Sequence, residues 1–216
     1  MAICLLTTIS LRKSVSRETE MAKAMSGQKT VTPTAEGLIA SVKATKTRGL
    51  PPVHLWNPPF CGDLDIRIAR DGTWYYLGTP FTRLELVKLF SSILKLEDGK
   101  YYLVTPVEKV GITVDDAPFV AIDFEVQGPG REQVLTFETK TGDFAEAGPD
   151  HPIRVTRDPE TGEPSPYIMI RAGLEALIDR KSFYRLVDIG EHHDGWFGLW
   201  SSGQFFPVIP SAELPD

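Results

Sequence analysis

The sequence has few of the residues from which disulfide frameworks, metal sites and membrane spans are built. Its 216 residues include only two cysteines, Cys4 and Cys61, which cannot form a disulfide framework and are typical of a reducing compartment. There are only four histidines, and no stretch approaches the ~20 continuous apolar residues that a membrane helix requires. We therefore expect a cytoplasmic protein with no membrane span and no cofactor.

No motif in the sequence marks a known kind of catalytic or nucleotide site. A Gly-x-Ser-x-Gly elbow for a serine nucleophile does not occur. Gly128-Pro129-Gly130 lies between two expected strands, and no helix follows whose N-terminus would hold a phosphate. We interpret Cys61 as a structural thiol and Asp115-Asp116 as a solvated turn. The residues alone therefore do not name an activity.

The net charge of −6 is unevenly distributed along the chain. Residues 1–48 contain eight Lys and Arg against three Asp and Glu, whereas residues 49–216 contain 15 against 26. Binding to phosphates requires clustered cations, so the acidic body argues against nucleic acid or an anionic lipid surface as the main partner.

Hydrophobic residues make up 42% of the chain, enough for one large domain or two small ones. The clearest pattern is in residues 65–114. There, alternating apolar residues, two Asp-Gly turns and one amphipathic run predict the order strand, strand, helix, strand, strand. The expected strands are 65–68, 74–77, 101–105 and 110–114.

The helix in this stretch has the sharpest start signal in the chain. Thr82 is a suitable N-cap residue, and Glu85 stands three residues later, as a capping box requires. Apolar residues then recur at helical spacing as far as Leu94. We expect Asp98-Gly99 to end the helix, because glycine tolerates the left-handed conformation there.

A shortened copy of the same order of elements occurs at 168–209. Strands are expected at 168–171, 174–178, 196–200 and 204–209, with a helix to Val187 that is capped by Asp179 or Ser182. This similarity predicts an internal duplication. Chance is the alternative explanation, because α+β chains often contain such loosely spaced runs.

The N-terminal third has weaker patterns. We interpret residues 1–32 as a disordered or mis-assigned extension, with translation starting at Met21 or Met25. A short helix is expected at 33–42. The proline-rich run 50–60 is expected to be extended and packed on the core, because its large apolar side chains are poorly suited to water. A polyproline-type partner motif is the alternative.

Residues 115–165 are expected to form sheet, with strands at 120–126, 134–139 and 152–156. Together the patterns predict an α+β fold made of two parts with antiparallel sheets, each containing a strand-strand-helix-strand-strand unit. The N-terminal α+β part covers 33–116, and the β-rich C-terminal part, with one helix, covers 117–216.

The histidines offer no specific metal site. His192 and His193 are adjacent, and in an extended segment their side chains point to opposite faces, so we interpret them as an exposed turn. His151 is expected in a loop and His54 in the proline-rich run. An unrecognised hydrolase or metalloenzyme that uses His54, His151 or His192 with nearby carboxylates is the alternative function.

Aromatic side chains occur in the expected strands of both copies. If the copies face each other, some of these side chains line a groove, with two basic residues as polar anchors. The candidate groove residues are Arg67, Trp74, Tyr76, Lys100, Tyr102, Trp196 and Trp200. The competing interpretation is core packing, because aromatic residues dominate protein cores.

Four stretches resemble the bacterial domain-of-unknown-function family 1285: PPVHLWNPPFCGDLDIRIARDGTWYYLGTPF, DGKYYLVTPVEKVGI, HPIRV and WSSGQFFPV. The resemblance extends from Gly49 to Val208. It implies a two-part α+β fold with internal duplication and a C-terminal part superficially like a pleckstrin-homology fold. It also implies a binding site between the parts and a role in signalling. It implies no catalytic residue.

We therefore favour a cytosolic binding or adaptor protein without catalysis. The expected partner is a small molecule or a protein segment, bound in the groove between the two parts. Exposed strand edges invite pairing, so a homo-oligomer is a further expectation.

Overall fold

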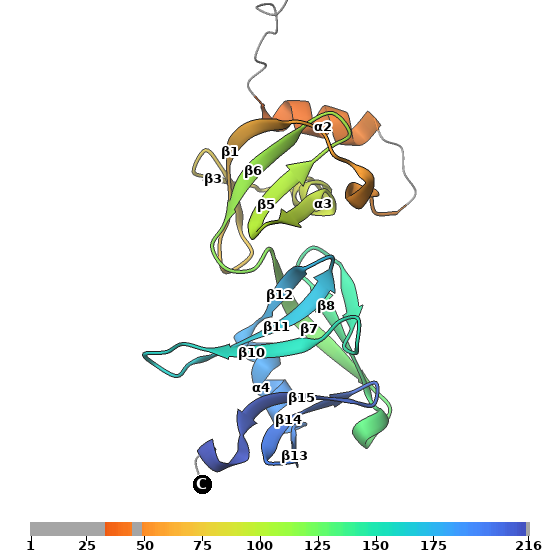
Figure 1. Cartoon of the computed structure of the whole chain (residues 1–216), viewed down its shortest axis with the longest axis vertical. Coiled ribbons are helices and arrows are strands. Elements are labelled where there is room, and N and C mark those ends of the chain that lie inside the picture. The colour runs from red at the N-terminus through yellow and green to blue at the C-terminus, as the bar shows by residue number, and fades with distance from the viewer. Residues whose placement is uncertain (1–32, 45–48, 215–216) are drawn as a thin grey trace, which may run out of the picture. The chain divides into compact units, whose positions relative to one another are not determined.

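The computed structural model describes residues 33–44 and 49–214 (Figure 1). The predictions made for residues 1–32 lie outside this range. Within it, the fold is α+β as predicted, with three α-helices and three sheets.

The first sheet contains six strands in the order β3-β2-β1-β6-β5-β4. Its strands are β1 (Phe60–Ile68), β2 (Trp74–Tyr76), β3 (Thr79–Pro80), β4 (Leu94–Glu97), β5 (Lys100–Val104) and β6 (Lys109–Val114). Helix α2 (Ala35–Ala44) and the short helix η1 (Val53–Leu55) precede it, and helix α3 (Leu84–Ser92) lies between β3 and β4 in the chain.

The second sheet also has six strands, in the order β10-β11-β12-β7-β8-β9. They are β7 (Phe119–Gln127), β8 (Val134–Thr139), β9 (Phe144–Glu146), β10 (Ile153–Arg157), β11 (Pro164–Arg171) and β12 (Leu174–Ile178), with the short helix η2 (Gly130–Glu132) before β8. Helix α4 (Arg180–Asp188) leads to a third sheet of β13 (Glu191–His193), β14 (Trp196–Ser201) and β15 (Gln204–Pro210), followed by η3 (Ser211–Glu213).

Both six-stranded sheets have the same topology. Each consists of two antiparallel three-stranded meanders, joined where the first strand of one meander pairs in parallel with the last strand of the other: β1 with β6, and β7 with β12. The copy predicted at 168–209 instead extends over two sheets, because β11 and β12 belong to the second and β13–β15 form the third. The shared strand order thus relates residues 60–114 to residues 119–178. The predicted internal duplication and the predicted likeness of the C-terminal part to a pleckstrin-homology fold remain predictions.

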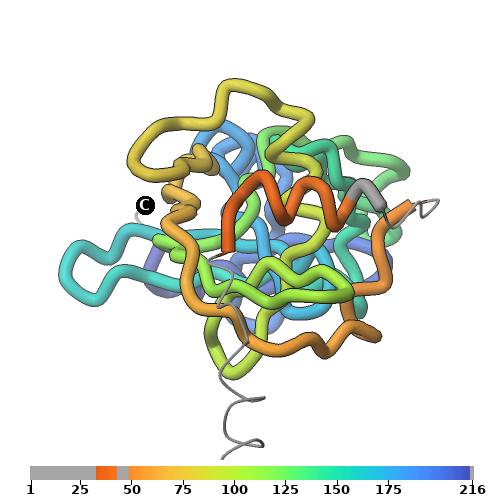
Figure 2. Tube along the Cα trace, turned by 90° about the horizontal axis from the view of Figure 1, so that it is seen from above, coloured from red at the N-terminus to blue at the C-terminus, as the bar shows by residue number. Residues whose placement is uncertain are grey.

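Alternating burial builds the core of the first sheet. Leu64, Ile66 and Ile68 of β1 are buried and their neighbours are exposed, as period-two patterning predicts. Helix α2 lies across this sheet, with Leu38 and Val42 in the core cluster (Figure 1, Figure 2). The helix predicted at 33–42 is therefore confirmed, although it spans Ala35–Ala44.

The predicted extent of the central helix is wrong at both ends. Helix α3 begins after Arg83, which makes no side-chain cap, so the capping box of Thr82 and Glu85 does not form. The helix ends at Ser92, and residues 94–97 form strand β4, which pairs with β5. Asp98-Gly99 is the hairpin turn between these strands, with φ values of 49° and 74°.

Two further expectations about packing hold only in part. The side chains of Leu55 and Phe60 are exposed rather than packed on the core, although Val53 in η1 is buried and Trp56 packs against the core cluster. In β7, the predicted alternation breaks at Ile122, which is exposed, because a register shift between Ala121 and Asp123 rotates the strand.

A buried serine attaches the third sheet to the second. Ser201, at the end of β14, is fully buried; its hydroxyl donates to the Ala147 carbonyl (2.7 Å) and accepts from the Leu135 N–H (2.9 Å). Gln133 adds a hydrogen bond from its side chain to the Trp200 carbonyl (2.8 Å). The Trp-Ser-Ser-Gly segment thus connects strands from two sheets.

We expect Ser201→Ala to lower the thermal unfolding temperature by several degrees. The substitution leaves the Leu135 N–H unpaired in the core, which costs about 1–3 kcal/mol, and each kcal/mol corresponds to about 2–4 °C at this chain length. The control is Ser202→Ala, because Ser202 also donates to the Ala147 carbonyl (3.0 Å) but is exposed. Differential scanning calorimetry that gave equal unfolding temperatures for the two variants would contradict this role.

A partly buried arginine connects helix α3 of the first sheet to the second sheet. Arg171, at the end of β11, forms an ion pair with Asp143 in the turn between β8 and β9. It also donates from Nη2 to the Ser91 carbonyl at the end of α3 (2.9 Å) and stacks over the Phe119 ring. The side chains of the pair are only 21% and 18% exposed.

We expect Arg171→Met to destabilise the protein by about 1–3 kcal/mol, because it leaves the partly buried Asp143 carboxylate without its partner. Arg157→Met is the matched control, since the Arg157–Glu213 ion pair is far more exposed and contributes about 0–1 kcal/mol. Urea unfolding monitored by tryptophan fluorescence measures both changes. A loss for Arg171→Met no larger than that of the control would rule out this connection as a major source of stability.

Candidate functional site

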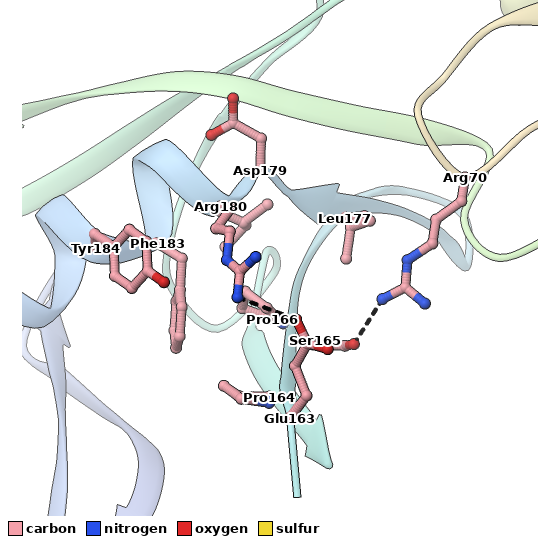
Figure 3. Close-up of a pocket in the computed structure, with 11 residues that line it drawn as sticks. Arg70, Glu163, Pro164, Ser165, Pro166, Leu177, Asp179, Arg180, Phe183 and Tyr184 are labelled. Atoms are coloured by element: carbon pink, nitrogen blue, oxygen red, sulfur yellow. Dashed lines mark hydrogen bonds and ion pairs between the residues drawn. The ribbon is translucent and has the colours of Figure 1, made fainter. Parts of the chain in front are cut away.

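A pocket of about 310 Å³ lies where strands β11 and β12 and helix α4 meet Arg70 of the β1–β2 turn (Figure 3). Its apolar walls are Pro164, Pro166, Leu177, Phe183 and Tyr184. The polar groups at its edge are two arginines, two carboxylates and the serine hydroxyl, namely Arg70, Arg180, Glu163, Asp179 and Ser165, and Tyr184 adds a phenolic hydroxyl. An apolar cavity with a few converging polar groups is the usual form of a ligand site.

The end of β12 explains why these side chains converge. In β12, Leu174, Ala176 and Ile178 face the core, which turns Leu177 toward the pocket. Asp179 then ends the strand and starts α4 by accepting a hydrogen bond from the Ser182 N–H (2.7 Å). This cap is one of the two that the sequence predicted.

Helix α4 supplies one wall of the pocket from a single face. Arg180, Phe183 and Tyr184 occupy positions i, i+3 and i+4, which are neighbours on a helix surface. Ser182 and Leu186, on the opposite face, are buried against the sheets. The helix is therefore fixed by one face while the other lines the pocket.

Arg70 is held in place from both sheets. Its Nη2 donates to the Ser165 hydroxyl (2.8 Å), and its Nε lies 3.3 Å from Asp116 Oδ2. The other oxygen of Asp116 accepts from the Tyr167 hydroxyl (2.8 Å). Burial raises the pKa of Tyr167, and the hydrogen bond to Asp116 raises it further, so the hydroxyl remains a donor at neutral pH.

Arg180 is held much more loosely. Its Nη2 lies 3.5 Å from Glu163 Oε1, and the two side chains are 74% and 64% exposed. Figure 3 shows this guanidinium directed across the pocket toward Glu163, while Arg70 is directed toward Ser165. The Arg70 side chain is also 61% exposed, so the two guanidinium groups differ in the number and length of their contacts, which favour a defined position for Arg70.

A second, more open cavity of about 590 Å³ adjoins the first. It shares Arg70, Leu177, Asp179 and Arg180 with the pocket, and adds Lys140 and the apolar side chains of Val120 and Ile122. Lys140 donates to the Asp71 carbonyl (3.2 Å), which keeps it beside the β1–β2 turn. Three cationic side chains thus surround the region where the two cavities meet.

The predicted groove residues of the first sheet have mostly structural contacts. Trp74 is 2% exposed and stacks on Phe90 in the core, so for this residue the structure favours the packing interpretation. Tyr76 is half-buried and stacks on Phe81, and Arg67 forms an ion pair with Asp115 (2.9 Å). These three side chains do not line the pocket at Arg70.

The other predicted groove residues lie in two different sheets. Lys100 is exposed in β5, and half-buried Tyr102 lies beneath the Lys109 ammonium. Trp196 is exposed in β14, while Trp200 packs with Phe205 and His193. None of them lines the pocket at Arg70 either, and a shared groove of all seven residues stays a prediction.

The sequence patterns do not mark Arg70, Arg180 or Glu163 as site residues. One usable signal was present: Tyr184 is an aromatic residue on the polar side of a short helix, next to Arg180 at helical spacing. Exposed aromatic and arginine residues are enriched at binding surfaces.

The histidines lie in three separate places. His54 is exposed in η1, His151 contacts the Met169 carbonyl through Nδ1 (2.9 Å), and His192 contacts the Ser211 hydroxyl (2.8 Å). His192 and His193 belong to strand β13, not to the predicted turn, which is Asp194-Gly195. Across residues 33–44 and 49–214, no three His, Cys, Asp or Glu side chains are grouped so that they could hold a metal ion.

None of the helices in the described range has the length and apolar character needed to cross a membrane.

Comparison with known proteins places the chain among proteins of unknown function. Residues 51–117 match the N-terminal domain of DUF1285, and residues 118–208 match the C-terminal domain of the same family. A search of curated proteins finds no match.

Two solved structures are similar to this chain. A DUF1285 family protein from Silicibacter pomeroyi DSS-3 is 68% identical, with a TM-score of 0.77, over 82% of this chain and 96% of that one. A DUF1285 family protein from Shewanella baltica OS155 is 32% identical, with a TM-score of 0.47, over 58% of this chain and 91% of that one. The two domain matches and the first of these structures show that this chain belongs to the DUF1285 family.

Proposed function

We propose that this protein is a binding module without catalysis, and that its site is the pocket between Arg70 and helix α4. The observation that carries the proposal is that a guanidinium from the first sheet is held, through Ser165 and Asp116, over apolar walls from the second sheet. A group fixed before binding loses little conformational freedom when a ligand arrives, which favours affinity.

The polar groups of the pocket suit binding better than catalysis. The pocket has two hydroxyls, those of Ser165 and Tyr184. Ser165 accepts a hydrogen bond from Arg70, and a cation beside a hydroxyl does not remove its proton as a general base would. Of the described residues, no histidine or cysteine lines this pocket. The groups present can orient and hold a ligand, which supports a sensor or adaptor in signalling.

The size of the pocket favours a small molecule over a protein segment. About 310 Å³ is at the lower end of the range for small-molecule sites. The adjoining cavity is wider and more open, so a ligand larger than the pocket would extend toward Ile122 and Lys140. A homo-oligomer through exposed strand edges stays a prediction.

We expect a fragment screen of the full chain by ligand-observed NMR to give binders that depend on Tyr184. Tyr184→Ala removes one wall of the pocket, and a lost aromatic contact of about 1–1.5 kcal/mol weakens binding roughly tenfold. Val187→Ala is the control, because Val187 is also exposed on α4 but does not line the pocket. Both positions are exposed, so neither variant should unfold the protein.

Binders that respond equally to both variants would place the site elsewhere. A screen without any binder would remove the small-molecule proposal and direct attention to a protein partner.

A further inference from the structure

We infer that the ligand of this pocket carries an oxyanion, a carboxylate or a phosphate, on a small apolar body, and that the oxyanion displaces Glu163 from Arg180. This inference rests on the proposed function of the pocket and adds the chemical class of its ligand.

Arg70 offers a fixed donor for an oxyanion. Its contacts use Nη2 and Nε, and among the described residues its Nη1 has no hydrogen-bond partner. A guanidinium has five N–H donors in a planar fork, which matches two oxygens of a carboxylate or phosphate. Because Ser165 and Asp116 already fix the plane of the group, the free side of the fork has a defined direction.

Arg180 has an internal anion that a ligand can replace. The separation of 3.5 Å from Glu163 exceeds the ~2.7–2.9 Å of a strong charge-assisted hydrogen bond. Exposed ion pairs of this kind contribute about 0–1 kcal/mol. A ligand oxyanion that also buries an apolar body gains more than this, so Glu163 acts as a weak competitor for the site.

The walls of the pocket define the rest of the ligand. Pro164 and Pro166 are rigid, and with Leu177 and Phe183 they form an apolar surface beside the two guanidinium groups. The volume of about 310 Å³ corresponds to the space of about ten water molecules at ~30 Å³ each. A one-ring acid fits within this space, whereas a larger ligand would have to extend into the adjoining cavity.

One carboxylate in the pocket opposes an anion, and its effect is reduced by its own bond. Asp179 accepts from the Ser182 N–H and caps α4, so its charge is partly offset by the positive end of the helix. Asp71 and Asp116 lie beside Lys140 and Arg70, so with Asp179 the carboxylates equal the three cations in number once Glu163 is displaced. The attraction for an anion therefore comes from the free N–H donors of the two guanidinium groups and not from an excess of positive charge.

The test compares phenylacetate, phenyl phosphate and the neutral phenylacetamide against the full chain by NMR titration. We expect at least one anion to bind at least tenfold more tightly than the amide, and to weaken as salt rises. Arg180→Gln and Arg70→Gln should each weaken that anion roughly tenfold. Preference for the carboxylate or the phosphate identifies which oxyanion the site takes.

Glu163→Gln is the distinguishing variant. It removes the internal competitor and keeps the shape of the side chain, so it should tighten binding of the anion about two- to fivefold, which corresponds to an ion pair of about 0.5–1 kcal/mol. Arg157→Gln, which removes a cation outside the pocket, is the control and should have no effect.

Three outcomes would overturn the inference. Amide binding as tight as anion binding would show an apolar pocket with no oxyanion site. Loss of anion binding in Arg180→Gln with no gain in Glu163→Gln would reject the displacement of Glu163. If none of the three probes bound while neutral fragments bound in a Tyr184-dependent way, the ligand class would be wrong but the pocket would still be a binding site. If no fragment bound either, the proposed function itself would fail.

Discussion

One guanidinium, that of Arg171, adds a partly buried link between the two sheets. It joins the Ser91 carbonyl at the end of α3 to Asp143 and the Phe119 ring, so a single side chain neutralises a carboxylate and caps a helix at once. Arg70 can contact Ser165 and Asp116 only while the first sheet keeps its place beside the second. The pocket is therefore supported by a contact made elsewhere as well, because the Arg171 bond adds to those that Arg70 and Lys140 make between the sheets.

Local patterns predicted the fold well where one physical rule decided the outcome. The alternation in β1, the cap at Asp179 and the Asp-Gly turns all follow from side-chain period or backbone conformation. The same rules could not decide residues 93–97. An Asp-Gly pair after an apolar run suits both a helix end and a hairpin turn, and only pairing with β5 makes β4 a strand.

The pocket could not be predicted in the same way, because its charged residues are common types in ordinary places. Arg70 follows a strand, Arg180 follows a cap and Glu163 precedes a proline, and no local rule connects them. Their meeting depends on β11 beginning at Pro164, four residues earlier than expected, and on the contact between the sheets. The prediction of a groove from aromatic residues has the opposite weakness. Trp74 lies in a regular strand, and its large apolar side chain packs in the core instead of lining a groove.

The parallel pairing that closes each six-stranded sheet has a consequence for how the chain folds during synthesis. One edge of β1 has no hydrogen-bonded partner strand until β6 has left the ribosome, and one edge of β7 has none until β12 has been synthesised. Bringing the first and last strands of a sheet together costs chain entropy before the contacts between them form. We therefore expect each sheet to complete late and in one step. Because all of β1–β6 precedes β7, the first sheet can close before the second is synthesised. Arg70 would then already be positioned when β11 and α4 fold beside it.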